Sequence, residues 1–241
     1  TGKTNYFISG TYYDEKGIVE NDNFNRKTVR MNLTNEVTSW YKVHVKSSFS
    51  SLDYSGVPVD LTYALSPYSN YYEDGTTDVL EYFPMEDPFF RHPYLNLQID
   101  DSDVRNDLWG MISSELDVPF IKGLKWTMNY AVNKRDQNRN QFQDNTLAIT
   151  QNGLALKENY NNFNWLYDNI LNYNKVFNNK HSIDATFLYS REYRRATNTT
   201  ARSTDFFNQK LGYDNLALGA VQTVQSGFSD QNNVGMMGRL N

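Results

Sequence analysis

The 241-residue sequence has no cysteine, only six prolines and no long hydrophobic run. Without cysteine there is no disulfide framework, and the redox compartment stays open. No window of about 18 or more residues is continuously apolar, which excludes a transmembrane helix. That test does not detect membrane-spanning strands, because such strands place apolar residues only at alternate positions.

Positive charge is also scarce, with 23 Lys and Arg against 28 Asp and Glu and a net charge of −5 at pH 7. A nucleic-acid-binding surface is normally basic, so we expect no nucleic-acid partner. The three histidines, His44, His92 and His181, are not spaced with cysteines or paired carboxylates as metal ligands would be. The sequence contains no P-loop, no GxSxG nucleophile elbow and no HExxH motif. We therefore expect no enzyme activity and no cofactor.

Aromatic residues, by contrast, are abundant. The chain contains 18 Tyr and 14 Phe, and aromatic residues make up 15% of the sequence. Together with many Asn, Thr and Ser residues, this composition is typical of β-strands joined by turns. The length is compatible with one large β domain, so we expect an all-β fold.

The clearest strand pattern lies in residues 107–132, which we interpret as one β-hairpin. In its second limb, Leu124, Trp126, Met128, Tyr130 and Val132 alternate with Lys125, Thr127, Asn129, Ala131 and Asn133. In its first limb, Leu108, Gly110, Ile112, Ser114, Leu116 and Val118 alternate with Asp107, Trp109, Met111, Ser113, Glu115 and Asp117. Successive strand side chains face opposite sides, so each limb has one apolar and one polar face. Each limb also has roughly the 9–11 residues with which a tilted strand crosses a bilayer.

The same pattern recurs along the chain. We expect further strands at about 5–13, 26–33, 40–51, 163–176 and 181–194, and an eighth strand after residue 231. Short turns at about 34–39, 119–123 and 177–180 alternate with long polar connections at about 52–105, 134–161 and 196–231. Outer-membrane barrels have short periplasmic turns and long extracellular loops. The pattern therefore favours an antiparallel transmembrane β-barrel in the bacterial outer membrane, in contact with outer-membrane lipid.

Two other interpretations remain open at this point. A complete eight-stranded outer-membrane barrel would have a lumen filled by side chains and a structural or adhesive role. A soluble carbohydrate-binding β-sandwich would use the same alternation to bury the apolar residues between two sheets. Thr1 is not an initiator methionine and residues 234–241 look like an interrupted strand, so we expect the sequence to be a segment of a longer chain.

Several short motifs resemble those of SusC/RagA-family TonB-linked outer-membrane transporters of Bacteroidetes. The motifs are residues 4–10 (TNYFISG), 12–19 (YYDEKGIV), 24–33 (FNRKTVRMNL), 37–43 (VTSWYKV), 121–125 (IKGLK), 171–177 (LNYNKVF) and 180–182 (KHS). Each motif alone is short, and their order along the chain makes the resemblance specific. The long connections match no motif of the family.

The resemblance implies a barrel of about 22 antiparallel strands with an N-terminal plug, of which this chain would supply about eight. It also implies a SusD-like surface lipoprotein that closes over the barrel, energy from the TonB complex, and import of an oligosaccharide or peptide nutrient. The plug domain, the TonB box and the remaining strands do not lie in this sequence, so the transport function follows from the resemblance alone.

The connection at 52–105 is the candidate binding region, because it combines aromatic side chains with carboxylates. The aromatic residues are Tyr63, Tyr68, Tyr71, Tyr72, Tyr82, Phe83, Phe89, Phe90 and Tyr94, and the acidic residues are Glu73, Asp74, Asp78, Glu81, Glu86 and Asp87. Aromatic faces beside carboxylate acceptors suit stacking on a sugar or contact with a protein partner. We select Tyr68, Tyr71, Tyr72, Tyr82 and Phe83 as candidate contacts to substrate or to the lipoprotein. The alternative is that these aromatic residues pack the connection onto itself.

Two smaller features complete the analysis. The cluster Asp100-Asp101-Ser102-Asp103 could bind calcium, but it lacks the turn glycine of an EF-hand loop, so we interpret it as a solvated acidic loop. Tyr12, Tyr13, Trp40, Tyr41 and Trp126 lie near predicted strand ends, where we expect aromatic girdles at the membrane interfaces.

Overall fold

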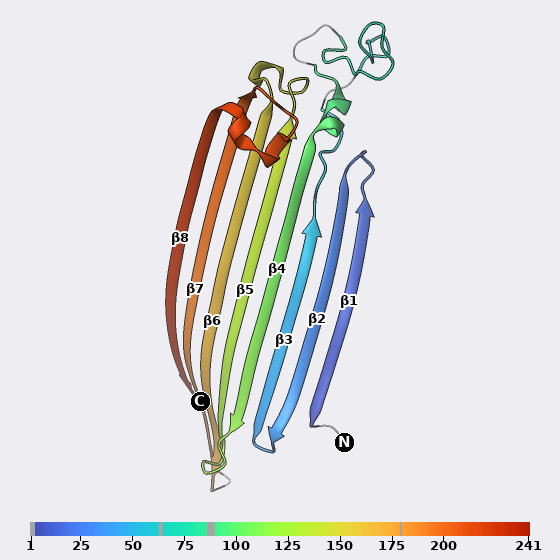
Figure 1. Ribbon diagram of the computed structural model, residues 1–241. Coiled ribbons are helices and arrows are strands. Elements are labelled where there is room, and N and C mark those ends of the chain that lie inside the picture. Colours follow the sequence, from blue (N-terminus) through green and yellow to red (C-terminus); the bar gives the residue numbers. More distant parts are fainter. Residues whose placement is uncertain (1–2, 63–64, 86–89, 179) are drawn as a thin grey trace.

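The computed structural model describes residues 3–62, 65–85, 90–178 and 180–241, which form one antiparallel sheet with its strands in sequence order (Figure 1). The eight strands are β1 (Thr4–Lys16), β2 (Asn23–Thr38), β3 (Tyr41–Asp53), β4 (Asp100–Asp117), β5 (Leu124–Gln143), β6 (Leu154–Phe177), β7 (His181–Phe206) and β8 (Gly219–Leu240). The predicted all-β antiparallel architecture is confirmed. No helix among the described residues is long and apolar enough to cross a membrane.

The sheet is open along both edges. Each strand pairs with its neighbours in the chain, and among the described residues β1 and β8 do not pair with each other. A closed eight-stranded barrel would need that last pairing, and a β-sandwich would need a second sheet. Neither alternative is the observed fold.

The strands are longer than the sequence pattern predicts. Residues 134–143, 154–161, 196–206 and 219–231 were expected in long connections, yet they extend β5, β6, β7 and β8. In these segments both faces of the sheet carry polar residues, so the alternation of hydrophobicity that marks a strand is absent. The predicted loops at 134–161 and 196–231 were therefore wrong, and the true loops are 144–153 and 207–218.

Two other boundaries also need correction. The predicted turn at 34–39 is mostly strand, because β2 continues to Thr38 through an irregularity in its pairing between Glu36 and Thr38. The first long loop is confined to residues 54–99, since β3 ends at Asp53 and β4 begins at Asp100. Asp100, Asp101 and Asp103 therefore lie on a strand, and the interpretation as a solvated acidic loop was wrong.

The pairing register sorts the strand residues into two faces. Leu33, Val45, Ile112, Tyr130 and Tyr167 lie directly beside one another on β2 to β6. Directly paired residues share a face, so this row belongs to what we call the apolar face. The predicted alternation of the hairpin at 107–132 is confirmed, because Leu116 pairs with Trp126 and Ile112 with Tyr130.

Large side chains on the apolar face remain exposed in this structure. Ile8 is 64% exposed, Ile112 is 53% and Phe187 is 46%. A soluble monomer rarely exposes a continuous apolar surface spanning a whole sheet. The apolar residues occupy the half of the sheet nearer the short turns, while Asn138, Asn161 and similar polar residues follow in the other half.

Strand length supports the same division. A strand rises roughly 3.3 Å per residue, so β7 with 26 residues is about 85 Å long. A tilted strand needs only about 9–11 residues to cross the hydrocarbon core. The upper half of β5 to β8 therefore extends well beyond the thickness of a bilayer, on the side of the longer loops.

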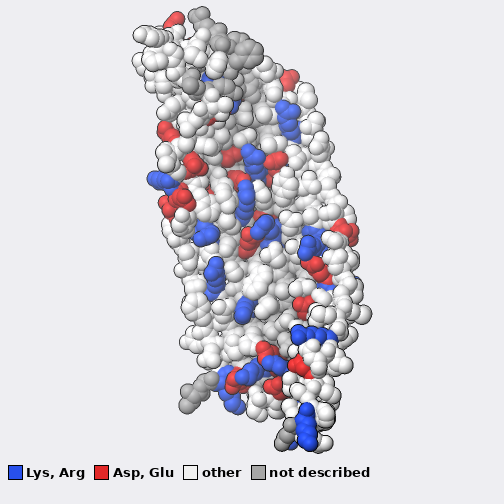
Figure 2. All heavy atoms as spheres, turned by 180° about the vertical axis from the view of Figure 1, so that it is seen from behind, with Lys and Arg blue, Asp and Glu red and all other residues white. Residues whose placement is uncertain are grey.

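The opposite, polar face carries most of the charged strand residues. Figure 2, which views the sheet from behind relative to Figure 1, shows acidic and basic side chains next to one another along this face. Ion pairs link neighbouring strands, including Lys125 with Glu115 at 2.6 Å and Arg135 with Asp107 at 2.5 Å. Such a face suits contact with water.

A small core covers the apolar side of the sheet near its upper end. There the loop 207–218, with its 3-10 turns η3 (Gly212–Asp214) and η4 (Leu216–Leu218), folds back over β5 to β7. Phe142, Ala155 and Phe206 are buried against Tyr213, Leu216 and Leu218. The hydroxyl of Ser203, which is fully buried, donates to the carbonyl of Leu216 at 2.8 Å.

We predict that replacing Met128 on the apolar face by arginine will lower the stability of the full-length protein in a bilayer by roughly 2–4 kcal/mol, because the charge would meet lipid. Asn129, on the polar face, accepts from the Ser113 hydroxyl at 2.6 Å and pairs opposite Asp168, so Asn129→Arg is expected to be tolerated. A spin label at residue 128 should contact the acyl chains and a label at 129 should not. Equal contact at both positions would contradict the assignment of faces.

Candidate functional site: a charged clasp and the long loop

On the polar face, the upper part of β4 and β5 forms a ladder of alternating charged and amide side chains. Asp101, Asp103, Arg105 and Asp107 pair opposite Gln141, Arg139, Gln137 and Arg135. Every second residue of each strand points to this face, so the ladder follows from the sequence spacing.

Asp103 is the centre of the ladder. Its side chain is nearly buried and accepts hydrogen bonds from Arg105 at 2.8 and 3.3 Å and from Gln137 at 3.1 Å. Two positions farther along the same face, Asp107 accepts from Arg135 at 2.5 and 3.1 Å. Forked guanidinium–carboxylate contacts of this kind are stronger than neutral hydrogen bonds and fix both side chains in one geometry.

The ladder holds the base of the long loop, residues 54–99. The Tyr54 amide donates to the Asp103 carbonyl at 2.8 Å, and the Asp103 amide donates to the Ser55 hydroxyl at 3.1 Å. The Gly56 amide donates to the Asp101 carboxylate at 3.1 Å. The Arg105 guanidinium lies 4.2 Å from the centre of the Tyr54 ring. We call Asp101, Asp103, Arg105, Gln137 and Tyr54 the clasp.

The clasp was not predicted from the sequence, although a signal was present. Residues 101–107 and 135–141 carry acidic, basic and amide side chains at every second position, which is the spacing of ladder partners on one face. The carboxylates of Asp101 and Asp103 bind guanidinium, side-chain amide and backbone N–H groups here, so they are not arranged as calcium ligands. Among the described residues no three His, Cys, Asp or Glu side chains gather as a metal site would require.

Beyond the clasp, the long loop has a core of its own around His92. His92 is only 1% exposed, and the Tyr71 ring packs against it edge-on at 4.6 Å. The Tyr94 amide donates to His92 Nδ1 at 3.1 Å, which caps the 3-10 turn η1 (Pro93–Gln98). Tyr72 packs edge-on against Tyr71 at 4.8 Å. For these two candidate residues, packing within the loop is the contact that the geometry shows.

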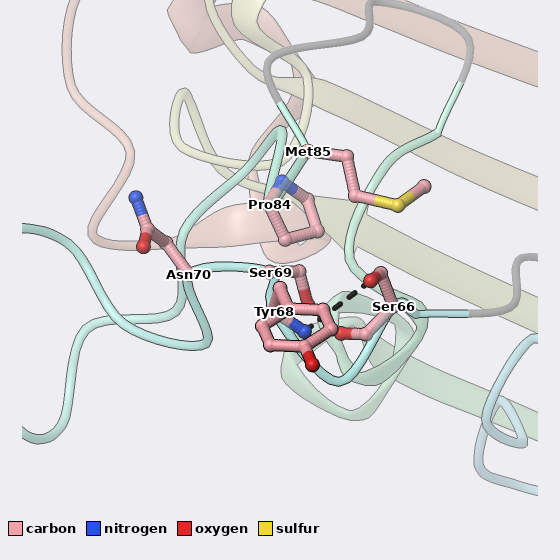
Figure 3. A pocket seen from close by; sticks show the side chains of 6 residues that line it. All are labelled: Ser66, Tyr68, Ser69, Asn70, Pro84 and Met85. Atoms are coloured by element: carbon pink, nitrogen blue, oxygen red, sulfur yellow. Dashed lines mark hydrogen bonds between the residues drawn. The ribbon is translucent and has the colours of Figure 1, made fainter.

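Tyr68 lies differently. Its side chain is 97% exposed at the edge of a pocket lined by Ser66, Tyr68, Ser69, Asn70, Pro84 and Met85 (Figure 3). The Tyr68 amide donates to the Ser66 hydroxyl at 3.2 Å, which holds the turn that carries the ring. This ring is free to contact a molecule outside the chain.

Tyr82 and Phe83 connect the long loop to the loop 144–153. Their rings pack edge-on at 4.7 Å, and the Tyr82 hydroxyl donates to the Leu147 carbonyl at 3.2 Å. Together with Ile149 and Leu154 they line a separate groove between the two loops. The five candidate residues therefore do not share one pocket. Tyr63, Glu86, Asp87, Pro88 and Phe89 lie outside the described residues.

We predict that Asp103→Ala will loosen the base of the long loop, because Arg105 and Gln137 lose their common acceptor beneath Tyr54. The expected loss of local stability is about 1–3 kcal/mol. It should appear as faster amide hydrogen exchange at Tyr54 and Gly56 in the full-length protein. Asp107→Ala is the matched control, since it breaks an ion pair on the same strand that makes no hydrogen bond to residues 54–56. Equal acceleration in both variants would contradict the role of the clasp.

We predict that the stability of the long loop depends on pH through His92. Burial lowers the pKa of His92 below its ordinary value, so the folded loop favours the neutral ring. The loop should therefore keep its full stability above pH of about 6.5 and lose it as the pH falls from there towards the lowered pKa. Hydrogen exchange of residues 90–98 should accelerate over that range. His92→Asn, which keeps a side-chain acceptor for the cap but does not titrate, should abolish the dependence; its persistence would show that another group is responsible.

Comparisons with known proteins support the architecture. No family model matches the sequence. TonB-dependent receptor P3 of Formosa agariphila is 25% identical over 253 residues, covering 98% of this chain and 25% of the receptor. TonB-dependent receptor P39 of the same organism is 24% identical over 188 residues, covering 75% of this chain and 17% of the receptor. The chain thus spans about a quarter or less of the length of the curated relatives it matches.

Solved structures of the RagAB peptide importer share the fold. The open-open state superimposes with a TM-score of 0.78 at 18% identity, and the closed-closed state with 0.73 at 17% identity. Each match covers the whole of this chain and 28% of the importer chain. The resemblance predicted from the sequence motifs is therefore confirmed: the chain is similar to SusC/RagA-type TonB-dependent transporters and has the fold of a segment of their β-barrel.

Proposed function

We propose that this chain forms part of the barrel wall of an outer-membrane, TonB-dependent nutrient importer. The observation that carries the proposal is the division of one sheet into two faces. The apolar face exposes Ile8, Ile112 and Phe187, while the polar face carries ion pairs such as Arg135 with Asp107. Lipid on one side and a water-filled lumen on the other would satisfy both faces.

The open edges of the sheet support a wide barrel. β1 and β8 each present one row of backbone groups without a strand partner among the described residues. In a bilayer such groups need hydrogen-bond partners, because hydrocarbon supplies none. Further strands on both sides, as in the 22-stranded barrel that the resemblance implies, would provide them. A wide lumen also suits the small and polar side chains of the polar face, such as Ser48, Ser113 and Thr127.

The relatives and the loops support a proposal for the substrate and the partners. We propose that the cargo is a peptide or an oligosaccharide, that a SusD-like surface lipoprotein covers the barrel, and that the TonB complex supplies energy through regions outside this sequence. The long loop, held by the clasp, would present Tyr68, Tyr82 and Phe83 at the outer rim. Tyr71 and Tyr72 would support that surface from within. The receptors and importers that this chain resembles are not named as enzymes, and we propose no catalytic role.

The test uses the full-length protein in its native membrane. We predict that it co-purifies with a surface lipoprotein and that cells lacking it lose TonB-dependent uptake of a labelled oligopeptide or oligosaccharide mixture. Tyr68→Ala should weaken the lipoprotein association or the uptake severalfold, because an exposed aromatic anchor is removed. Phe207→Ala is the control, since Phe207 is 79% exposed on the other rim loop. Uptake unchanged by deletion of the protein, with no lipoprotein bound, would refute the proposed function.

A further inference from the structure

A group of cations and aromatic rings lies on the apolar face, where its exposed apolar residues give way to polar ones. Lys134 on β5, Phe163 on β6 and Arg195 on β7 lie in one row across the sheet. One pairing step nearer the short turns lies Trp165, and Arg191 lies over the Trp165 ring at 5.7 Å. We call these five residues the cationic patch.

The position of the patch along the strands is defined by its neighbours. On the same face, Val132 pairs opposite Trp165 and Tyr167 pairs opposite Arg191, and Tyr189 lies one step nearer the short turns. Towards the long loops, it carries Asn161 and Thr197. If the apolar residues meet the hydrocarbon core, as the proposed function requires, the patch lies at headgroup level on the side of the long loops. Aromatic residues are enriched at that level in barrels.

The charges of the patch are only partly compensated within the chain. Lys134 pairs with Asp136 at 2.9 Å. In the part of the chain that the structure describes, neither Arg191 nor Arg195 forms an ion pair with a carboxylate. Arg195 instead lies 5.2 Å from the centre of the Phe228 ring, although Asp230 is paired opposite it across β7 and β8. Two guanidinium groups that face lipid without an ion-paired carboxylate would be stabilised by an anion from outside the chain.

The surface around Arg195 is also shaped to hold one. A groove beside Arg195 is lined by Lys134, Asn161, Asn162, Phe163, Arg195 and Thr197, of which all but Asn162 belong to this face by their pairing. Arginine binds phosphate oxygens through two parallel hydrogen bonds, and Asn and Thr side chains can bind hydroxyl or amide groups beside them. Phe163 lines this groove, and Trp165 lies one step nearer the short turns on the same face, where acyl chains would lie.

We propose that the cationic patch binds the headgroup of a lipid that carries a phosphate group in the outer leaflet. This inference rests on the proposed membrane location of the apolar face. The phosphate would lie between Arg191 and Arg195, the polar part of the headgroup would contact Asn161 and Thr197, and the acyl chains would descend along Trp165 and Tyr189. The lipid would complete the charge balance of the wall at this level.

Native mass spectrometry of the full-length protein, released from nanodiscs, tests the proposal with monophosphoryl lipid A as the probe. The wild type should retain this lipid, and the double variant Arg191→Gln/Arg195→Gln should retain about tenfold less, because both guanidinium contacts to phosphate are lost. Arg194→Gln is the matched control. Arg194 neighbours Arg195 but lies on the polar face, where it pairs with Glu192 at 2.6 Å, so its loss should leave retention unchanged.

Three comparisons make the result decisive. The dephosphorylated lipid should be retained no better by the wild type than by the double variant, and millimolar inorganic phosphate should not displace the bound lipid. Equal retention of the phosphorylated lipid by the wild type and the double variant would overturn the proposal, as would displacement by inorganic phosphate, which would indicate a site for the free ion. Arg191→Lys/Arg195→Lys keeps the charges and should restore part of the retention. Failure of the wild type to enter nanodiscs would instead overturn the proposed membrane function. A double variant that inserts and supports uptake normally but retains less lipid shows that lipid binding can be lost while the proposed function stands.

Discussion

Each strand residue can face only one of two sides, and this constraint governs the whole structure. Eight strands keep a common register, so the apolar set of one strand lies beside the apolar set of the next. A slip of one residue in any pair would exchange the two faces of that strand. The turns help to prevent such a slip. At Gly123, which has a φ of 91°, an added Cβ would come within 2.0 Å of the Asn174 carbonyl oxygen, so the hairpin and β6 meet there only because this residue is glycine.

The same constraint explains what could be predicted from the sequence. Where one face is apolar, as in residues 107–132, alternation reveals the strand, its parity and its partner. Where both faces are polar, as at Asn161 beside Thr197, the sequence has the composition of a loop and the strand is missed. Continuous backbone pairing stabilises those segments, and pairing leaves no trace in hydrophobicity. The family motifs identified the fold despite these errors, because they lie mainly at turns and in the apolar parts of strands.

The candidate site shows a similar division. The sequence marks the long loop as aromatic and acidic, but it does not separate Tyr68, which is exposed, from Tyr71, which packs against a buried histidine. That distinction depends on contacts between residues about 20 positions apart within an irregular segment. The hydrogen bond of Tyr82 to Leu147 and the contact of the tilted Phe24 and Tyr54 rings at 4.8 Å join segments still farther apart in the sequence. The clasp is the exception, since its charges alternate along two adjacent strands.

The strands extend beyond the part of the apolar face that carries apolar residues, and the loops cover this extended end. Without them, this end of the apolar face would meet water and be covered by its own side chains alone. The loop 207–218 folds over that face and buries Phe142 and Phe206, while the long loop is fixed to the opposite face through Asp103 and Arg105. The two loops thus hold the extended end of the sheet from both sides. A sheet whose end is cross-linked by loops on both faces can keep those loops in fixed positions relative to one another, as a rigidly supported binding surface requires.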